Sequence, residues 1–571
     1  MSQQKPKGKE SVTTSAIRKC TRRQFIGLTL AGGVGVAGAS LFTACAQPAP
    51  PTATTAPAAG PAATAAPAAG ASKTLVVGVS IDDIVSLDPH RAMEVIYPVF
   101  DHACYETLVT YENNDFSKPL PALATSWDVS SDAKVYTFKL RQGVKFASGN
   151  PMTSDDVKWS YERLINLKGQ PAFFLDSLDK VEAPDAQTVK VTLKQSDASF
   201  LAAITAPPVA IIDRKTAEAH GATAAADADK TDKAEQWLTS NSIGTGPYVI
   251  TQYTAKGQVQ LKRNQNAWKP AKYFDEVLVK GVPDAGTQQL MLQKGDIDLA
   301  GNLQPEHIQA LKGNKDVAVA STPSTDVAYL GMTRDPKKNE ALAKPEVGQA
   351  IRAAIDYEGL KALVPGSVRD AFIVTSGLAG SLPVSEAPAT DLNKAKELLT
   401  KAGYPNGFKA KLNVSATMVR AGAKIVNIAQ KVQADLAKVG IQIELVTAED
   451  NVWRDGFKAG AHEMTITGYF MDYPDTSNYL AVFLPDGLMA KRMGYTLDKD
   501  TQGLVPLLQK ALATPDESKR LPMYQDIQRK ILADGPWAAL IEPLMSYAHR
   551  ADIKGVLAEP TYYFSPQNFY R

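Results

Sequence analysis

The sequence predicts a mixed fold of strands and helices, α/β or α+β, over residues 73–571. Short apolar or alternating runs, which are typical of strands, are interleaved with apolar faces of helical period. Capping residues and glycines separate these segments. The composition, 44% hydrophobic and 21% charged over 571 residues, is that of a globular protein that needs two or three cores.

The first half of this region supplies three predicted strands and one well-marked helix. Residues 75–79 form a short apolar run that suits a buried strand. Residues 134–140 and 189–194 alternate with period two, as half-buried strands do. Between them, Thr153 supplies an N-cap, and the acidic residues that follow it favour the first turn of a helix.

The second half predicts helices that are followed directly by strands. Asp391 opens a helix that closes at Gly403, and a second apolar helical face begins at Lys424 and ends at Gly440. Residues 441–446 alternate immediately afterwards. A helix, a glycine cap and then a strand make half of a βαβ unit, whose parallel strands are buried on both faces.

The first 44 residues predict an export signal. Seven basic side chains and one acidic one accompany an uncharged stretch, residues 25–44, that is rich in Gly and Ala. A signal anchor is the alternative, since about 20 apolar residues can span a bilayer, although the glycines make this a poor membrane helix. Residues 21–26 resemble the twin-arginine motif, but Gly27 replaces the usual Lys, so general secretion stays open.

A lipid anchor and a tether are predicted next, over residues 45–72. Residues 41–45 resemble a bacterial lipobox, with Phe42 where Leu is more usual. In lipoproteins of that kind the cysteine, here Cys45, is diacylated and becomes the new N-terminus; a cysteine placed there by chance is the alternative. Residues 46–72 contain 13 Ala, 6 Pro and no charged residue, which is the composition of an unfolded tether.

Several classes of chemistry lack their sequence motifs. The six His are scattered and the three Cys have no metal-site spacing, so the sequence predicts no metal and no cofactor. Phosphate-loop and G-x-S-x-G patterns are missing from the sequence, although a carboxylate pair assembled from distant positions stays open. Residues 244–247, Gly-Thr-Gly-Pro, predict a rigid turn. A net charge of +2 gives no reason to expect a nucleic-acid partner.

Five ordered groups of residues resemble the large extracytoplasmic solute-binding proteins of ABC importers, the dipeptide- and oligopeptide-binding family 5. In chain order they are residues 87–90; 120–127 with 136–141 and 144–146; 149–157; 244–248 with 261–264; and 294–298. Each group alone is weak, and their order over nearly all of residues 73–571 makes the resemblance specific.

The resemblance implies a periplasmic-binding-protein-like, two-lobed α/β fold of type II, with an additional β-rich domain inserted in the first lobe. A ligand that contacts both lobes favours the closed state. The expected division is lobe I at 73–112, 240–340 and 535–571, an inserted α+β subdomain at 113–239, and lobe II at 341–534. The expected protein is a monomer, not an enzyme, held to the membrane by lipid, that passes a peptide to permease subunits.

The resemblance also suggests which residues bind the ligand. A zwitterionic peptide needs a carboxylate for its amino group and a cation for its carboxylate. Asp472 matches the family's Asp for the peptide N-terminus, with Tyr469 as an aromatic wall; capping a turn is the alternative role for Asp472. Arg420 matches an Arg that pairs with the ligand carboxylate, unless it is merely exposed. Trp453 is either a cleft aromatic or a packing residue.

Other functions remain open at this point. The same family includes binders of nickel chelates, haem, oligosaccharides and opines. A sensory receptor that passes the closed state to a signalling partner has the same sequence features. An exported hydrolase of peptides or sugars needs a nucleophile and base or paired carboxylates, and no motif for either is present.

Overall fold

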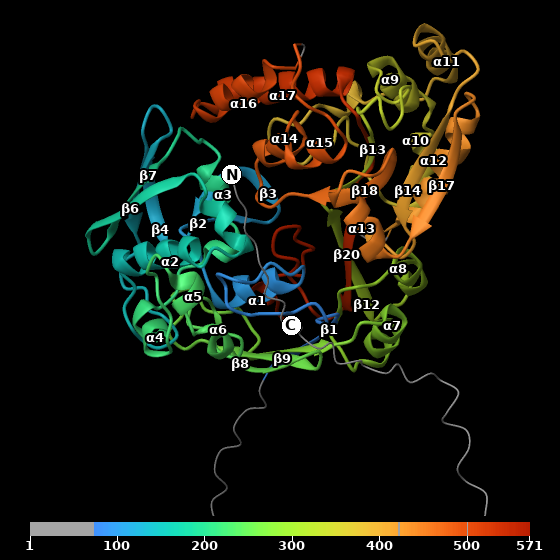
Figure 1. Cartoon of the computed structure of the whole chain (residues 1–571). Coiled ribbons are helices and arrows are strands. Elements are labelled where there is room, and N and C mark those ends of the chain that lie inside the picture. Colours follow the sequence, from blue (N-terminus) through green and yellow to red (C-terminus); the bar gives the residue numbers. More distant parts are fainter. Residues whose placement is uncertain (1–72, 421–422, 500) are drawn as a thin grey trace, which may run out of the picture. The chain divides into compact units, whose positions relative to one another are not determined.

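A computed structural model describes residues 73–571 except 421–422 and 500. Two large mixed sheets and one smaller sheet organise this region, with helices packed against them (Figure 1). Within the described residues, the helices are all too short or too polar to cross a membrane. The predicted export signal, Cys45 and the tether lie outside the described residues.

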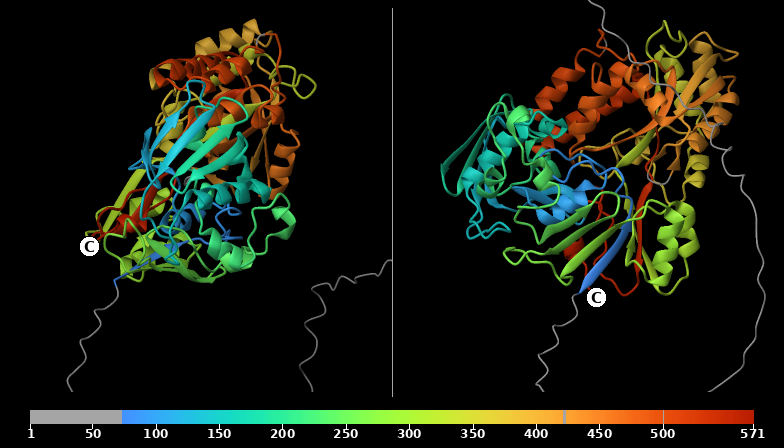
Figure 2. Two further views of the ribbon diagram at one scale, coloured as in Figure 1. Left: turned by 90° about the vertical axis from the view of Figure 1, so that its left-hand side faces the viewer. Right: turned by 60° about the horizontal axis from the view of Figure 1, so that its bottom comes forward.

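The first large sheet has seven strands, and the predicted strand at 75–79 is its centre, β1 (Thr74–Val79). In pairing order the strands are β12 (Val317–Pro323), β20 (Leu544–Arg550), β11 (Leu299–Ala300), β1, β10 (Glu276–Gly281), β9 (Gln258–Arg263) and β8 (Tyr248–Thr254). Strand β1 is parallel to both β10 and β11. The right-hand view of Figure 2 shows β1, in blue, between strands from much later in the chain.

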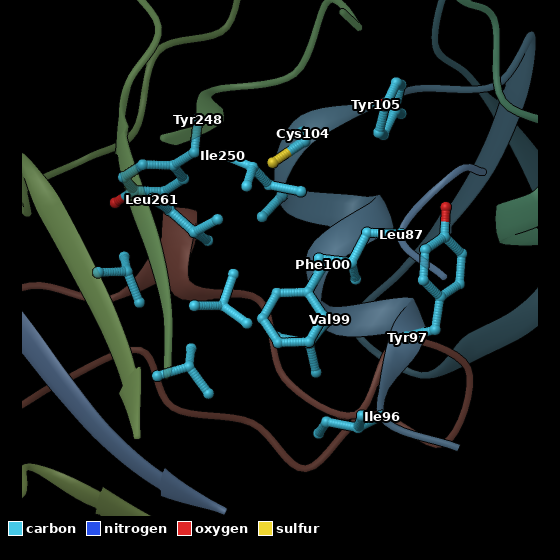
Figure 3. Packing of buried hydrophobic residues seen from close by; sticks show 14 of the residues in the cluster. Leu87, Ile96, Tyr97, Val99, Phe100, Cys104, Tyr105, Tyr248, Ile250 and Leu261 are labelled. Carbon is cyan, nitrogen blue, oxygen red and sulfur yellow. The ribbon is translucent and has the colours of Figure 1, made fainter. Parts of the chain in front are cut away.

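Helix α1 (Tyr97–Cys104) closes the core of this sheet. Figure 3 shows Cys104 pointing from α1 toward Tyr248 and Ile250 of β8. The predicted rigid turn at 244–247 packs against the end of this helix, where a Cβ on Gly244 or Gly246 would overlap the backbone at Cys104. The two glycines therefore permit close packing of this turn against the backbone at the end of α1.

The second large sheet has five strands and contains the predicted βαβ unit. In pairing order they are β17 (Gln442–Ala448), β14 (Lys409–Ser415), β18 (Met464–Phe470), β13 (Asp326–Met332) and β19 (Trp537–Ile541). Helix α12 (Ile425–Ala437) connects β14 to its parallel neighbour β17, which confirms the prediction. One face packs against α9 (Pro345–Ala354), α10 (Tyr357–Leu363) and α12, and the other against α14 (Thr476–Phe483) and α17 (Glu517–Asp534).

A four-stranded antiparallel sheet lies within residues 113–239. Its strands, in pairing order, are β4 (Ala124–Val129), β5 (Val135–Leu140), β7 (Thr188–Leu193) and β6 (Leu178–Asp185). The two predicted alternating strands are β5 and β7. Helix α2 (Ser154–Asn166) begins with the predicted cap: the Thr153 N–H donates to Asp156 Oδ2 at 2.8 Å. This sheet and α2 share their own apolar core.

The chain crosses between the two large sheets at two neighbouring places, from β12 to β13 and from β19 to β20. The crossing segments hold each other: Thr325 N–H donates to Glu542 Oε1 at 2.8 Å, and Ser324 N–H donates to Pro543 O at 3.1 Å. Strands β13 and β19 fall in the ranges predicted for lobe I, but they pair in the five-stranded sheet. The division into lobes otherwise stays a prediction.

Candidate functional site

A cavity of about 1020 Å³ lies where the chain crosses between the two large sheets. Its wall takes residues from β12 and β20 of the first sheet, and from the ends of β13 and β18 of the second. Helix α8 (Pro305–Leu311), the end of α10 and strand β15 (Val419–Arg420) complete it. Its volume is at the upper end of the range for small-ligand sites, about 300–1,000 Å³.

Arg420 brings a cation to this wall. It lies in a short hairpin formed by β15 and β16 (Ala423–Lys424), directly before α12. Its stem passes over Gly468 of β18, where an added Cβ would lie 3.2 Å from Arg420 Cγ. Within the described part of the chain, the guanidinium forms no ion pair. A half-buried guanidinium without a carboxylate partner is suited to bind an anionic ligand.

Asp326 lies beside Arg420, and the two side chains interact electrostatically. It faces Phe470 across the β13–β18 pairing, and both side chains line the cavity. Burial raises the pKa of the Asp326 carboxyl, and the charge of Arg420 opposes that rise without cancelling it. Its Oδ1 is buried with no hydrogen-bond partner among the described residues. Asp326 and Arg420 form no ion pair among the described residues, so the guanidinium can still accept a ligand anion.

Asp472 follows the end of β18. Its Oδ2 accepts hydrogen bonds from Tyr469 OH at 3.0 Å and Asn478 Nδ2 at 3.2 Å. Burial raises the pKa of Asp472, and the two hydrogen bonds work against this rise. In the region the structure describes, Asp472 forms no ion pair, and it is not among the residues that line the cavity. Asp475 caps α14 by accepting from Ser477 N–H at 2.8 Å, a role separate from that of Asp472.

Tyr469 orients Asp472 instead of lining the cavity wall. Its ring packs edge-on against Tyr479 and Phe483, with centroids 5.3 Å away in both cases. Side chains alternate between the faces of a strand, so the neighbouring Phe470 points to the opposite face and lines the cavity. The aromatic ring expected at 469 on the cavity wall is therefore supplied by residue 470.

Trp453 takes the packing role that the sequence left open. It lies on α13 (Asp450–Lys458), is 4% exposed and stacks against Phe457 at 5.3 Å. The indole N–H donates to Asn413 O at 3.2 Å and to Thr465 Oγ1 at 3.1 Å. These contacts tie α13 to β14 and β18 beneath the site.

The structure thus brings Arg420 together with Asp326 and Phe470, and separately groups Asp472 with Tyr469. Both groups lie at the carboxyl end of β18 and on opposite faces of it. Residues Asp326 and Phe470 were not predicted. Alternation along 464–470 separates Phe470 from Tyr469, whereas nothing local marks Asp326, which reaches the site through pairing with a distant strand. Among the described residues, no cluster of His, Cys, Asp or Glu could hold a metal ion.

Two mixed sheets joined by paired crossings, with a cavity at the crossings, define a two-lobed periplasmic binding protein. Solved structures share this fold. The ABC transporter-associated periplasmic binding protein DppA from Helicobacter pylori, in complex with the peptide STSA, is 26% identical with a TM-score of 0.68, covering 87% of this chain and 98% of that one. The protein AgaA of A. tumefaciens R10, in complex with agropinic acid, gives the same identity, TM-score and coverage.

The sequence comparisons identify the family. Residues 118–489 match "Bacterial extracellular solute-binding proteins, family 5 Middle", and the chain belongs to this family of solute-binding transport proteins. A probable D,D-dipeptide-binding periplasmic protein of Escherichia coli K12 is 27% identical over 497 residues, which is 85% of this chain and 92% of the relative. The family resemblance in the sequence and the two-lobed α/β fold that it implied are confirmed.

Proposed function

We propose that this protein captures a peptide with free ends and delivers it to the permease of an ABC importer. One observation carries the proposal: Arg420 and Asp472 lie at the same end of β18, on opposite faces of it, and neither forms an ion pair among the described residues. A bound zwitterion needs both of its charges paired, because leaving one unpaired costs several kcal/mol, on the order of 3–5. The peptide-binding relatives support the same assignment.

Capture works through the crossing segments. A ligand held by residues of both sheets binds best when the two sheets are brought together, so binding shifts the population toward the closed state. Hinge closure of this kind needs only a few residues whose backbone angles change. Residues 324–325 and 542–543 are the two segments that connect the sheets at the cavity, and they are the candidate hinge.

We further propose that the protein is a monomer located outside the cytoplasm and anchored to the membrane by lipid at Cys45. The lipobox-like residues 41–45 and the uncharged tether at 46–72 support it, as does the family's extracellular character. Mass spectrometry of the membrane fraction should find a diacylated N-terminal Cys45, and Cys45→Ala should release the protein from membranes. Recovery of wild-type protein from the cytosol with its complete leader contradicts this part.

Calorimetry with di- to pentapeptides tests the peptide assignment. Peptides with free ends should bind, whereas N-acetylated or C-amidated versions should bind far more weakly, because each modification removes one charge. Equal affinity for blocked peptides contradicts the charge-pair mechanism. The protein should return every peptide chemically unchanged, and measurable turnover contradicts the assignment as a binding protein.

The relative that binds agropinic acid favours one other ligand class, amino-acid-derived carboxylates such as opines. A thermal-shift screen separates the two classes, because a ligand that binds only the folded state adds RT ln(1+[L]/Kd) to its stability. A shift with opines and none with peptides supports the alternative.

A further inference from the structure

We propose that this site selects peptides whose C-terminal residue carries a bulky apolar side chain; the inference rests on the proposed peptide-binding function. Its basis is a group of apolar residues, called here the apolar wall, that are exposed and line the same cavity. They are Val95, Val319, Leu363, Val419 and Phe470, which are 52%, 38%, 47%, 39% and 43% exposed.

The apolar wall is assembled from both large sheets. Val319 belongs to β12 of the first sheet, and Phe470 to β18 of the second. Val95 lies just before α1, Leu363 ends α10, and Val419 begins β15. Exposed apolar side chains scattered singly need no explanation, whereas a group of them around one cavity marks a binding surface. An apolar group that fills this cavity contacts both sheets and so favours closure.

Arg420 fixes which part of a peptide reaches this wall. It follows Val419 directly, and its stem passes over Gly468, two residues before Phe470. Gly468 and Phe470 share one face of β18, so a carboxylate bound to the guanidinium would place the side chain of its own residue near Phe470. Besides Arg420 and the buried Asp326, the charged residues that line the cavity are Glu306 and Lys312, which are exposed to solvent and carry opposite charges.

The chemistry of this wall discriminates against polar C-terminal residues. A charged or amide side chain placed against it loses hydration without gaining a partner, which is unfavourable. An aliphatic or aromatic side chain instead removes apolar surface from water on both sides of the contact. Each buried methylene should strengthen binding about fourfold, so leucine should exceed alanine by at least about tenfold.

Calorimetric titration of the exported chain tests this selection directly. The peptides vary only in their last residue, Leu, Phe, Ala, Ser or Lys, at the length that binds most tightly in the panel of free-ended peptides. Leu and Phe should bind at least about tenfold more tightly than Ala, and Ser and Lys more weakly still. If Ser or Lys peptides bind as tightly as Leu peptides, the selection is contradicted while peptide binding stands. If no peptide binds, the proposed function itself is overturned.

Two matched pairs of substitutions test whether the apolar wall causes the preference for apolar C-terminal residues. Val419→Thr and Leu363→Ser remove apolar character from the wall, and each should reduce the Leu-to-Ala ratio at least about threefold. Val452→Thr and Leu290→Ser change exposed residues on α13 and on α7 (Ala285–Lys294), and should leave the ratio unchanged. An unchanged ratio in both wall variants contradicts the assignment. If a variant folds poorly, the peptide series on the unmodified protein still tests the proposed preference for apolar C-terminal residues.

Discussion

Two arginines of this protein, Arg163 and Arg420, show how partners decide the role of a charge. Arg163 of α2 is fully buried and donates to both oxygens of Asp88, at 2.9 and 2.6 Å, and to Asp232 Oδ2 at 2.9 Å. Arg420 lies half-buried on the cavity wall without an ion pair among the described residues. The first cation is satisfied by the fold, and the second is left for a ligand.

The contrast extends to the carboxylates beside each arginine. Burial raises the pKa of Asp88, but the charge and hydrogen bonds of Arg163 outweigh it and hold that pKa below its usual value. Beside Arg420, burial prevails and the pKa of Asp326 is raised. A bidentate pair stabilises the ionised acid far more than a cation that forms no hydrogen bond to it. Pairing within the chain therefore separates structural charges from candidate ligand-binding charges.

The largest expected effect is on folding, at Arg163. Replacing it with Met leaves Asp88 and Asp232 buried with only the longer ion pairs from Arg91, at 3.5 and 3.3 Å, which should lower the free energy of unfolding by about 3–5 kcal/mol. Urea unfolding measures this change. Peptide affinity of the folded fraction should stay within about twofold, since Arg163 does not line the cavity. A loss of stability below about 1 kcal/mol contradicts the structural role.

At Arg420 the same substitution should affect peptide affinity and leave stability nearly unchanged. Arg420→Met should leave the urea midpoint nearly unchanged and cost about 2–5 kcal/mol of peptide affinity, which is the range for removing one partner of a buried charge pair. Arg420→Lys keeps the charge and loses the two-pronged geometry, so it should recover only part of the affinity. A large loss of stability with normal peptide affinity would mean that Arg420, like Arg163, has a structural role and does not bind the ligand.

Asp472→Asn tests the other charge. The amide keeps an oxygen that can accept from Tyr469 OH, so the fold should persist, while the attraction for an ammonium is lost. Affinity for free-ended peptides should fall by about 1.5–3 kcal/mol, the value of hydrogen bonds to charged groups. Calorimetry should show that N-acetylated peptides bind the variant and the wild type alike. Continued preference for the free amine contradicts the role of Asp472.

Gly468→Ala tests the placement of Arg420 without changing any charge. The new Cβ would lie 2.6 Å from Asp326 Oδ1 and 3.2 Å from Arg420 Cγ, so one of them must move. Overpacking of this kind costs about 1–3 kcal/mol. We expect about a tenfold weaker peptide affinity, by titration, with circular dichroism unchanged. As a control, Gly377→Ala adds a Cβ where nothing lies within 4 Å, and it should leave affinity unchanged.

The last prediction concerns the pH dependence of stability, at the second crossing segment. Burial first, and then the negative charge of Asp370, raise the pKa of Glu542 to about 8. The folded protein therefore holds a proton that the unfolded chain releases, so stability falls as pH rises from about 4.5 toward 8.

Glu542→Gln removes this dependence and keeps an acceptor for Thr325 N–H. Its stability relative to wild type should rise by at least about 1.4 kcal/mol between pH 5 and pH 9, since each unit of pKa shift corresponds to about that amount. Urea unfolding at the two pH values measures the difference. Parallel pH profiles for the two proteins contradict the buried, protonated state of Glu542.

Local patterns predicted local structure correctly. The βαβ unit around α12, the alternating strands β5 and β7, and the capped start of α2 all follow from residues near one another in sequence. The family resemblance suggested Arg420 as a ligand-binding candidate, and the structure places it on the cavity wall. Its binding role stays a prediction, as does that of Asp472.

The crossings and the cavity wall could not be predicted in this way, because distant contacts determine them. Thr325 has a φ of 59°, which favours glycine, and its backbone is held by Glu542 and by Tyr479 OH at 2.7 Å. Pro323 and Ser324 suggest a turn there, but a threonine gives no sign of a positive φ. Similarly, alternation puts Tyr469 and Phe470 on opposite faces of β18, but only the packing of α14 and the hairpin decides which face borders the cavity.

A double cycle of titrations tests the central claim most directly. One free-ended peptide and its C-terminal amide are each titrated into wild-type protein and into Arg420→Met. Amidation should weaken binding to the wild type by at least about tenfold, or about 1.4 kcal/mol. It should weaken binding to the variant by less than about threefold, because the variant already lacks the arginine that pairs with the carboxylate. An equal loss in both proteins would contradict the pairing of Arg420 with the peptide carboxylate.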